Sequence, residues 1–189
     1  KEKIALILAI SFYLNFWIQE QNIFDFHSVS LGTTLLLATF YFLLKKRYAL
    51  FSLFLILSVM TKENVFMVAS FFGLYLLLKE KKWLIGSVLT IVPTLIFFFL
   101  VSKAIPDARG NAHFALSFYS YLGENTQEIV QNVITKPQIV LGHLFSFSTI
   151  IYLNQLLIPI GYLALLSPLY LAFTLPELAI YLLSAHPGM

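Results

Sequence analysis

Two residues with the chemistry of a catalytic pair, Asp25 and His27, stand two positions apart just before a long apolar run. A carboxylate and an imidazole at this spacing could act as a base and its orienting partner, or share a divalent cation. The same position is also typical of a helix cap, in which Asp25 or Ser28 accepts a free backbone N–H. The spacing leaves both interpretations open.

A second polar group, Thr61-Lys62-Glu63-Asn64, separates two short apolar runs. Ionisable residues at membrane depth are costly and are therefore functional candidates. Lys62 could hold a phosphate, and Glu63 could act as a base or a metal ligand. The alternative is a solvated turn in which Thr61 or Asn64 caps the next helix. The shortness of the flanking runs favours a recessed turn that lines a cavity.

The third group lies in the long polar segment 102–137. Two of its basic residues could hold an anionic lipid headgroup, and two tyrosines with a carboxylate resemble the lining of a carbohydrate site. The alternative for the tyrosines is ordinary packing at the membrane interface. The candidate substrate-binding residues are Lys103, Arg109, Tyr119, Tyr121 and Glu124.

Composition places all of these groups in a membrane protein. Of the 189 residues, 59% are hydrophobic and 11% are charged, whereas a soluble domain carries about 25% charge. The net charge of +3 comes from loop lysines and arginines rather than from a basic stripe, so we expect no nucleic-acid partner. The chain has no cysteine, which excludes disulfides, thiolate metal sites and cysteine nucleophiles. His113 and His143 lack metal-ligand spacing, so neither of them is expected to bind a metal.

Two basic clusters give the orientation of the chain, Lys45-Lys46-Arg47 and Lys79-Glu80-Lys81-Lys82. Lys and Arg collect in short cytoplasmic loops of multi-pass proteins, so residues 45–47 and 79–82 are predicted to be cytoplasmic. Alternating spans then place the three candidate groups on the outer face of the cell membrane. The apolar runs that would supply these spans are 4–18, 29–44, 48–60, 65–78 and 83–101.

The uncharged run 139–175 is too long for one span and contains Pro159 and Pro168. One division has an interfacial helix to about residue 148, a span over 149–166 and a returning span over 169–184. The other is a single tilted span over 156–175. The predicted fold is thus an all-α transmembrane bundle with about six or seven spans. It forms one integral membrane domain over 1–189, and segment 102–137 forms an outer loop with a short helix over 126–134.

Several of these short motifs occur in the same order in one family. They are the outer Asp25-Phe26-His27, the Lys62-Glu63 turn, the long outer loop and the closing pattern around Pro159-Ile160-Gly161 and Leu175-Pro176-Glu177. Between about residues 19 and 184 the chain resembles a family of bacterial and archaeal multi-pass membrane proteins of unknown function. That family is thought to be related to the C-type glycosyltransferases, which include the protein O-mannosyltransferases.

The resemblance implies a helical membrane enzyme that takes a sugar from a polyprenyl-phosphate carrier on the outer face. Asp25, His27, Lys62 and Glu63 would then be the catalytic candidates, with a divalent cation as a possible cofactor. The usual catalytic carboxylate of such enzymes lies in the first outer loop of the whole protein. Because the chain opens with Lys, we interpret it as a fragment that starts after that loop. The alternatives are a transporter or lipid flippase, and a non-catalytic membrane scaffold.

Overall fold

The computed structural model describes residues 2–15, 19, 28–110 and 114–185, and every regular element within them is a helix. The helical class expected from the sequence is therefore observed. The helices of the N-terminal half begin and end within a few residues of the apolar runs. They are α1 (Glu2–Tyr13), α3 (Ser28–Leu44), α4 (Tyr48–Val59), α5 (Val65–Leu78) and α6 (Trp83–Phe99).

The predicted six or seven membrane spans are wrong. In the described ranges one stretch, Trp83–Arg109, is long and apolar enough to cross a membrane, and a bent pair of helices, Pro137–Leu144 and Phe147–Ile160, adds at most a second. With 12 and 14 residues, α4 and α5 are about 18 and 21 Å long, whereas the hydrocarbon core is about 30 Å thick. Apolar composition located the helices correctly, but most of them are too short to span.

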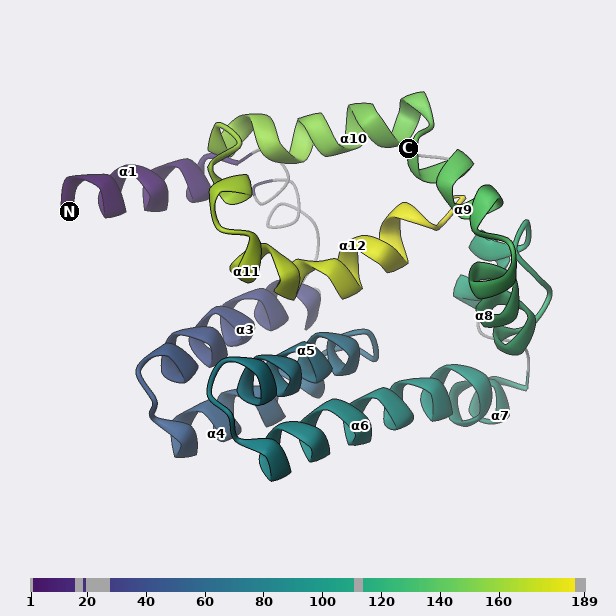
Figure 1. Cartoon of the computed structure of the whole chain (residues 1–189), viewed down its shortest axis with the longest axis horizontal. Coiled ribbons are helices and arrows are strands. Elements are labelled where there is room, and N and C mark those ends of the chain that lie inside the picture. Colours follow the sequence, from purple (N-terminus) through teal and green to yellow (C-terminus); the bar gives the residue numbers. More distant parts are fainter. Residues whose placement is uncertain (1, 16–18, 20–27, 111–113, 186–189) are drawn as a thin grey trace.

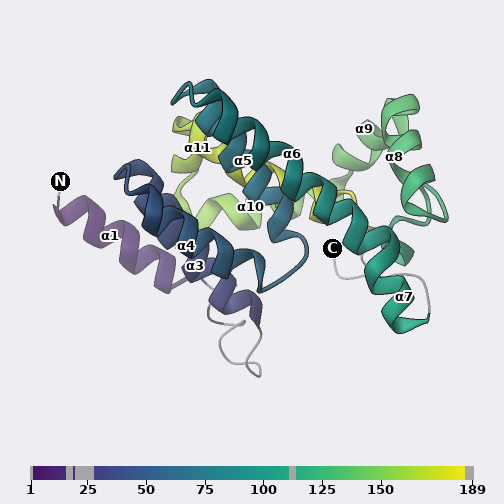
Figure 2. The same cartoon turned by 90° about the horizontal axis from the view of Figure 1, so that it is seen from below.

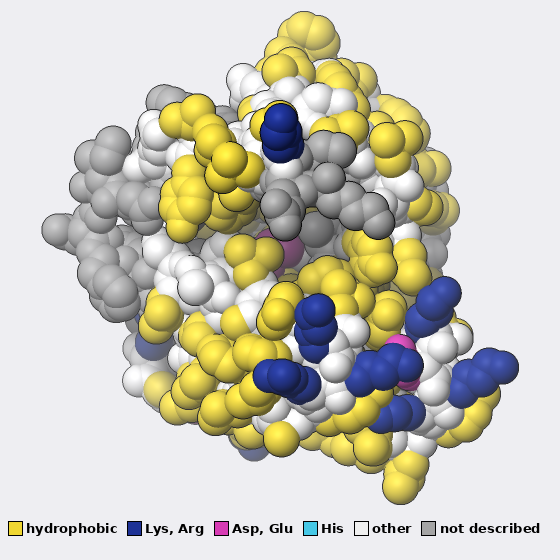
Figure 3. Space-filling view, turned by 90° about the vertical axis from the view of Figure 1, so that its left-hand side faces the viewer, with side chains coloured by type: hydrophobic (Ala, Val, Ile, Leu, Met, Phe, Trp, Pro, Cys, Tyr) yellow, Lys and Arg dark blue, Asp and Glu magenta, His cyan; other side chains and the backbone are white. Residues whose placement is uncertain are grey.

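The long stretch is α6, continued by the π-helical turn η1 (Leu100–Ala104) and by α7 (Ile105–Arg109). Only 17% of its most apolar window is buried, so this helix is not the core helix of a compact domain. The protein also exposes 12624 Å², whereas a compact monomer of this size exposes about 9,200 Å². Many large apolar side chains are exposed, and the space-filling view shows apolar side chains over much of one face (Figure 3). This surface is suited to contact with lipid.

Helices α3 to α6 form two antiparallel hairpins that lie side by side (Figures 1 and 2). In the second hairpin Ser70 and Thr94 share a hydrogen bond of 2.8 Å between their hydroxyl groups. Gly73 lets the backbones approach closely, because a Cβ atom there would lie 2.7 Å from the backbone carbonyl carbon of Leu89. Small residues and hydroxyl pairs of this kind are typical of helix contacts in membranes.

The C-terminal half curves back over these hairpins in a series of short helices (Figure 1). Its elements are η2 (Phe114–Tyr119), α8 (Thr126–Thr135), α9 (Pro137–Leu144), α10 (Phe147–Leu157), η3 (Ile158–Ile160), η4 (Leu163–Leu166), α11 (Pro168–Leu171), η5 (Ala172–Thr174) and α12 (Leu175–Leu182). Asn125 caps α8 by accepting from the backbone N–H of Glu128 at 2.9 Å. The short helix predicted at 126–134 is therefore present.

Neither predicted division of residues 139–184 is correct. No helix runs through 149–166 or 156–175, because the backbone turns at two successive residues in the left-handed region, Gly161 (φ 57°) and Tyr162 (φ 58°). Glycine adopts this conformation without steric cost. Pro159 precedes the turn and lacks the N–H that a continuing helix needs. The predicted turn at Ser167 and Pro168 is present, but it joins two short helices.

The core lies between α3, α4 and α5 and contains Leu43, Phe51, Leu55, Val68, Ala69, Phe72, Tyr75 and Leu76. Phe173 of η5 packs onto this core from the C-terminal half. Its ring centroid lies 5.2 Å from that of Phe40, 4.9 Å from that of Phe72 and 5.6 Å from that of Tyr75. This aromatic contact holds the following helix, α12, against the start of α5.

Candidate functional site

The turn between α4 and α5 is not the capped, solvated turn that was one of the two alternatives. Asn64 stands at the N-cap position of α5 but makes no side-chain capping bond, and only 8% of it is exposed. The Thr61 hydroxyl donates backwards to the backbone oxygen of Ser58 at 2.6 Å. Lys62 is exposed and Glu63 is half-buried. The turn therefore buries the side-chain amide of Asn64 and leaves the ammonium group of Lys62 exposed.

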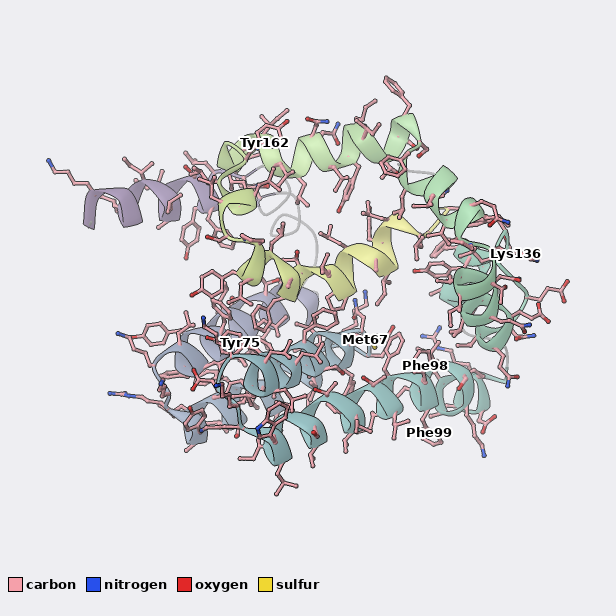
Figure 4. All side chains as sticks on the ribbon, viewed as in Figure 1. Met67, Tyr75, Phe98, Phe99, Lys136 and Tyr162 are labelled. Carbon is pink, nitrogen blue, oxygen red and sulfur yellow. The ribbon has the colours of Figure 1, made fainter. Side chains whose placement is uncertain are left out.

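The partner of this amide comes from the other half of the protein. The side-chain N–H of Asn64 donates to Oε1 of Glu177 at 2.5 Å, across 113 residues of sequence. Glu177 lies in the first turn of α12, the helix that follows Phe173 along the chain. Met67, labelled in Figure 4, marks the start of α5 against which α12 packs.

The electrostatics around Glu177 are set mainly by its apolar surroundings. Glu177 is exposed as a residue, yet partial desolvation of its carboxyl group raises its pKa above the usual value. Lys62 acts in the opposite direction, Glu63 raises the pKa further, and the hydrogen bond from Asn64 lowers it. Lys62 and Glu63 are thus close enough to Glu177 to influence its protonation.

Oδ1 of Asn64 is buried and has no hydrogen-bond partner. A buried acceptor left unpaired costs about 1–3 kcal/mol, so it marks a place where a donor is expected. A donor group of a ligand that reached this oxygen would satisfy it.

Two tyrosines from the segment after α7 attach to the end of α12. The Tyr119 hydroxyl donates to the backbone oxygen of Ile180 at 2.5 Å, and the Tyr121 hydroxyl donates to that of Leu183 at 2.8 Å. Burial raises the pKa of Tyr119 to about 12, with a further contribution from the negative charge of Glu177. The Tyr119 hydroxyl therefore stays protonated and uncharged at neutral pH. The ring of Tyr121 stacks on that of His143 with centroids 5.0 Å apart.

The structure brings together only part of the predicted set. Asp25 and His27 lie outside the described residues. Lys103 in η1 and Arg109 at the end of α7 are exposed on the long helix. The remaining candidate, Glu124, is exposed beside the start of α8, where its backbone N–H donates to Oε2 of Glu128 at 3.0 Å. Lys62, Glu63 and Tyr119 are the predicted residues that lie near enough to Glu177 for an electrostatic interaction.

Glu177 itself was not predicted to be a site residue. It was visible in the sequence as the first ionisable residue after the uncharged run 139–175. A carboxylate at the end of such a run is costly to bury and therefore merits attention. What the sequence could not show is the packing of Phe173, which brings this carboxylate to the α4–α5 turn.

No three His, Cys, Asp or Glu side chains in the described ranges are grouped so that they could hold a metal ion. The predicted divalent cation, with Asp25 or Glu63 as ligand, stays a prediction because Asp25 lies outside those ranges.

The family model described as predicted membrane protein (DUF2079) matches residues 1–189, which is every residue of this sequence. The chain belongs to this family. The DUF2079 description agrees with a membrane location, which the composition predicts and the apolar surface supports. It gives no link to glycosyltransferases. Neither a curated protein nor a solved structure matches this DUF2079 sequence.

The raised pKa of Glu177 predicts how the stability of this DUF2079 protein depends on pH. A folded state with a raised pKa holds its proton more tightly than the unfolded state does. Stability from this group is therefore full below the ordinary pKa of 4.5 and is lost as the pH rises through the folded-state pKa. Thermal unfolding in detergent, from about pH 4 to pH 8, should show this loss in the wild type and not in Glu177→Gln. A wild type that gains stability relative to Glu177→Gln as the pH rises would contradict the sign.

Proposed function

We propose that the chain belongs to a membrane glycosyltransferase that takes a sugar from a polyprenyl-phosphate carrier. The observation that supports this is the hydrogen bond between Asn64 and Glu177, with Lys62 and Glu63 close enough to shift the pKa of Glu177 and with Tyr119 close enough to be influenced by its charge. An ammonium group next to two carboxyl groups, one with a raised pKa, is a suitable set for acid–base chemistry on an anionic substrate. The resemblance to relatives of the C-type glycosyltransferases agrees with it.

In the proposed reaction Lys62 holds the phosphate of the carrier. The bond between the sugar C1 and the phosphate oxygen breaks, and its electron pair leaves with the polyprenyl phosphate. An acceptor hydroxyl forms the new bond to C1 and gives its proton to Glu177. Desolvation, with a smaller contribution from the charge of Glu63, raises the pKa of Glu177, which makes Glu177 a better proton acceptor. Asn64 positions the Glu177 carboxylate.

The experiment uses the protein in proteoliposomes with polyprenyl-phosphate sugars that carry ¹⁴C in the sugar, namely mannose, glucose and N-acetylglucosamine. Glycosyl transfer to water or to an added acceptor moves the label out of the lipid fraction. A flippase, the alternative function, would move intact labelled lipid between the leaflets. A scaffold would do neither. Label that stays on the lipid with all three sugars would contradict the proposal.

The orientation is part of the same proposal: loops 45–47 and 79–82 face the cytoplasm, and segment 102–137 faces outward across the plasma membrane. The sequence has no cysteine of its own, so single introduced cysteines can be labelled in intact cells with an impermeant maleimide. We expect labelling of Asn111→Cys and none of Lys46→Cys or Glu80→Cys. The reverse pattern would overturn the orientation.

A further inference from the structure

The two basic loops lie together at one end of the hairpins, opposite the α4–α5 turn. Nζ of Lys46 lies 3.6 Å from Oε2 of Glu80, which joins the first loop to the second. Nζ of Lys82 lies 3.1 Å above the ring of Tyr48, so the start of α6 contacts the start of α4. Figure 3 shows basic side chains gathered around an acidic one at this end. Six basic residues and one acidic residue make it strongly positive.

Both helices that start here have N-termini without a side-chain cap. The N-cap residues are Arg47 for α4 and Lys82 for α6, and neither makes a side-chain capping bond. The free N–H groups and the helix dipoles of two helices therefore point to the same basic end. Such ends favour an anion such as a phosphate.

An apolar groove begins at this basic end and runs between the same two helices. Its walls include Phe51, Leu55 and Ile56 of α4 and Leu84, Val88 and Val92 of α6, and its volume is about 470 Å³. From Leu84 to Val92 it extends about 12 Å along α6. Among the described residues that line it, Ser52 is the one with a polar side chain. The volume lies in the range of ligand pockets, about 300–1,000 Å³.

We propose that this groove binds an anionic phospholipid, with one acyl chain between α4 and α6 and the phosphate at Arg47 and Lys82. The charge at the mouth matches the headgroup, and the lining matches the hydrocarbon. Basic pockets between helices at a membrane surface bind lipid headgroups in this way. A helix of a second copy would fit the apolar walls, but it would not use the uncapped N–H groups or the lysines. The site is separate from the cluster at Glu177.

Trp83, the first residue of α6, is 67% exposed at the mouth and serves as the probe. The sequence has two tryptophans, so the measurements use a Trp17→Phe variant in which Trp83 is the source of tryptophan fluorescence. Vesicles of phosphatidylcholine are doped with dibrominated phosphatidylglycerol or with dibrominated phosphatidylcholine, whose bromines quench tryptophan on contact. We expect half-maximal quenching at a mole fraction of phosphatidylglycerol about five-fold lower than that of phosphatidylcholine.

Three variants test the parts of the site. Arg47→Gln with Lys82→Gln should abolish the lipid preference, whereas Lys3→Gln with Lys136→Gln removes the same charge elsewhere and should keep it. Val88→Phe should weaken the preference by filling the groove while leaving the charge unchanged. Val88 is 53% exposed, so the larger ring has room to be accommodated in the fold.

Equal quenching by the two lipids would overturn the proposal. An unchanged lipid preference in Arg47→Gln/Lys82→Gln would exclude these two residues as the phosphate site and would also overturn the proposal. An unchanged preference in Val88→Phe would do the same, because it would exclude the groove as the site of the acyl chain. Conversion of a dimer to a monomer by Val88→Phe would assign the groove to a second copy of the protein instead.

Discussion

Replacing Glu177 with Gln should lower the rate of sugar transfer by about 10²- to 10⁴-fold, the usual contribution of a general base. Gln has the same shape and can still accept the Asn64 hydrogen bond, so the fold and the substrate affinity should change little. A pH–rate profile of the wild type should show a limb controlled by a carboxyl group with a raised pKa, and the variant should lack that limb. Rates come from ¹⁴C sugar released from the polyprenyl-phosphate donor.

Lys62→Ala and Glu63→Ala should abolish transfer for different reasons and leave membrane insertion intact. The first removes the cation that holds the carrier phosphate. The second removes a negative charge that adds to the effect of desolvation in raising the pKa of Glu177. The matched controls are Lys136→Ala and Asp107→Asn, which remove one exposed charge of each sign away from the site. Wild-type turnover in both Lys62→Ala and Glu63→Ala would rule out this assignment.

Gly73→Ala should destabilise the protein by about 1–3 kcal/mol, since overpacking against immobile backbone is costly. The new Cβ atom would lie 2.7 Å from the backbone carbonyl carbon of Leu89 and closer still to the backbone nitrogen of Thr90. Both atoms belong to the backbone of α6, so they can move away only if α6 separates from α5. The expected result is a lower thermal unfolding midpoint in detergent, together with poorer recovery from the membrane.

Gly142→Ala is the matched control for this prediction. Gly142 also lies within a helix, α9, but a Cβ atom there would meet nothing within 4 Å. Alanine has the higher helix propensity by about 1 kcal/mol, so this variant should be neutral or slightly more stable. Equal destabilisation by the two substitutions would show that loss of glycine flexibility, and not the contact between α5 and α6, determines the result.

The sequence predicted the positions of α3 to α6 well, because apolar runs between basic loops leave little choice of helix boundary. It failed on the number of spans. A run of 12 or 14 apolar residues shows where a helix forms, but it does not show whether the helix crosses the membrane or packs on the protein. The left-handed turn at Gly161 and Tyr162 was also missed, since Tyr162 gives no sign that it would adopt this conformation.

The sequence predicted some residues of the candidate site but not Glu177. The polar turn at Lys62 and Glu63 stood out because it interrupts apolar sequence, and Tyr119 stood out by its type. Glu177 joins them through the packing of one aromatic ring, Phe173, among Phe40, Phe72 and Tyr75. A contact across 113 residues depends on tertiary packing, which has no periodic signature in the sequence.

That separation has a consequence for how the protein is made. A ribosome adds roughly 5–20 residues each second, so on the order of ten seconds pass between synthesis of Asn64 and synthesis of Glu177. During this interval the Asn64 amide faces solvent, lipid or a chaperone. The nascent polypeptide does not yet contain Glu177, which accepts the hydrogen bond of this amide in the folded protein. Products released early by the ribosome would contain the hairpins but would be inactive.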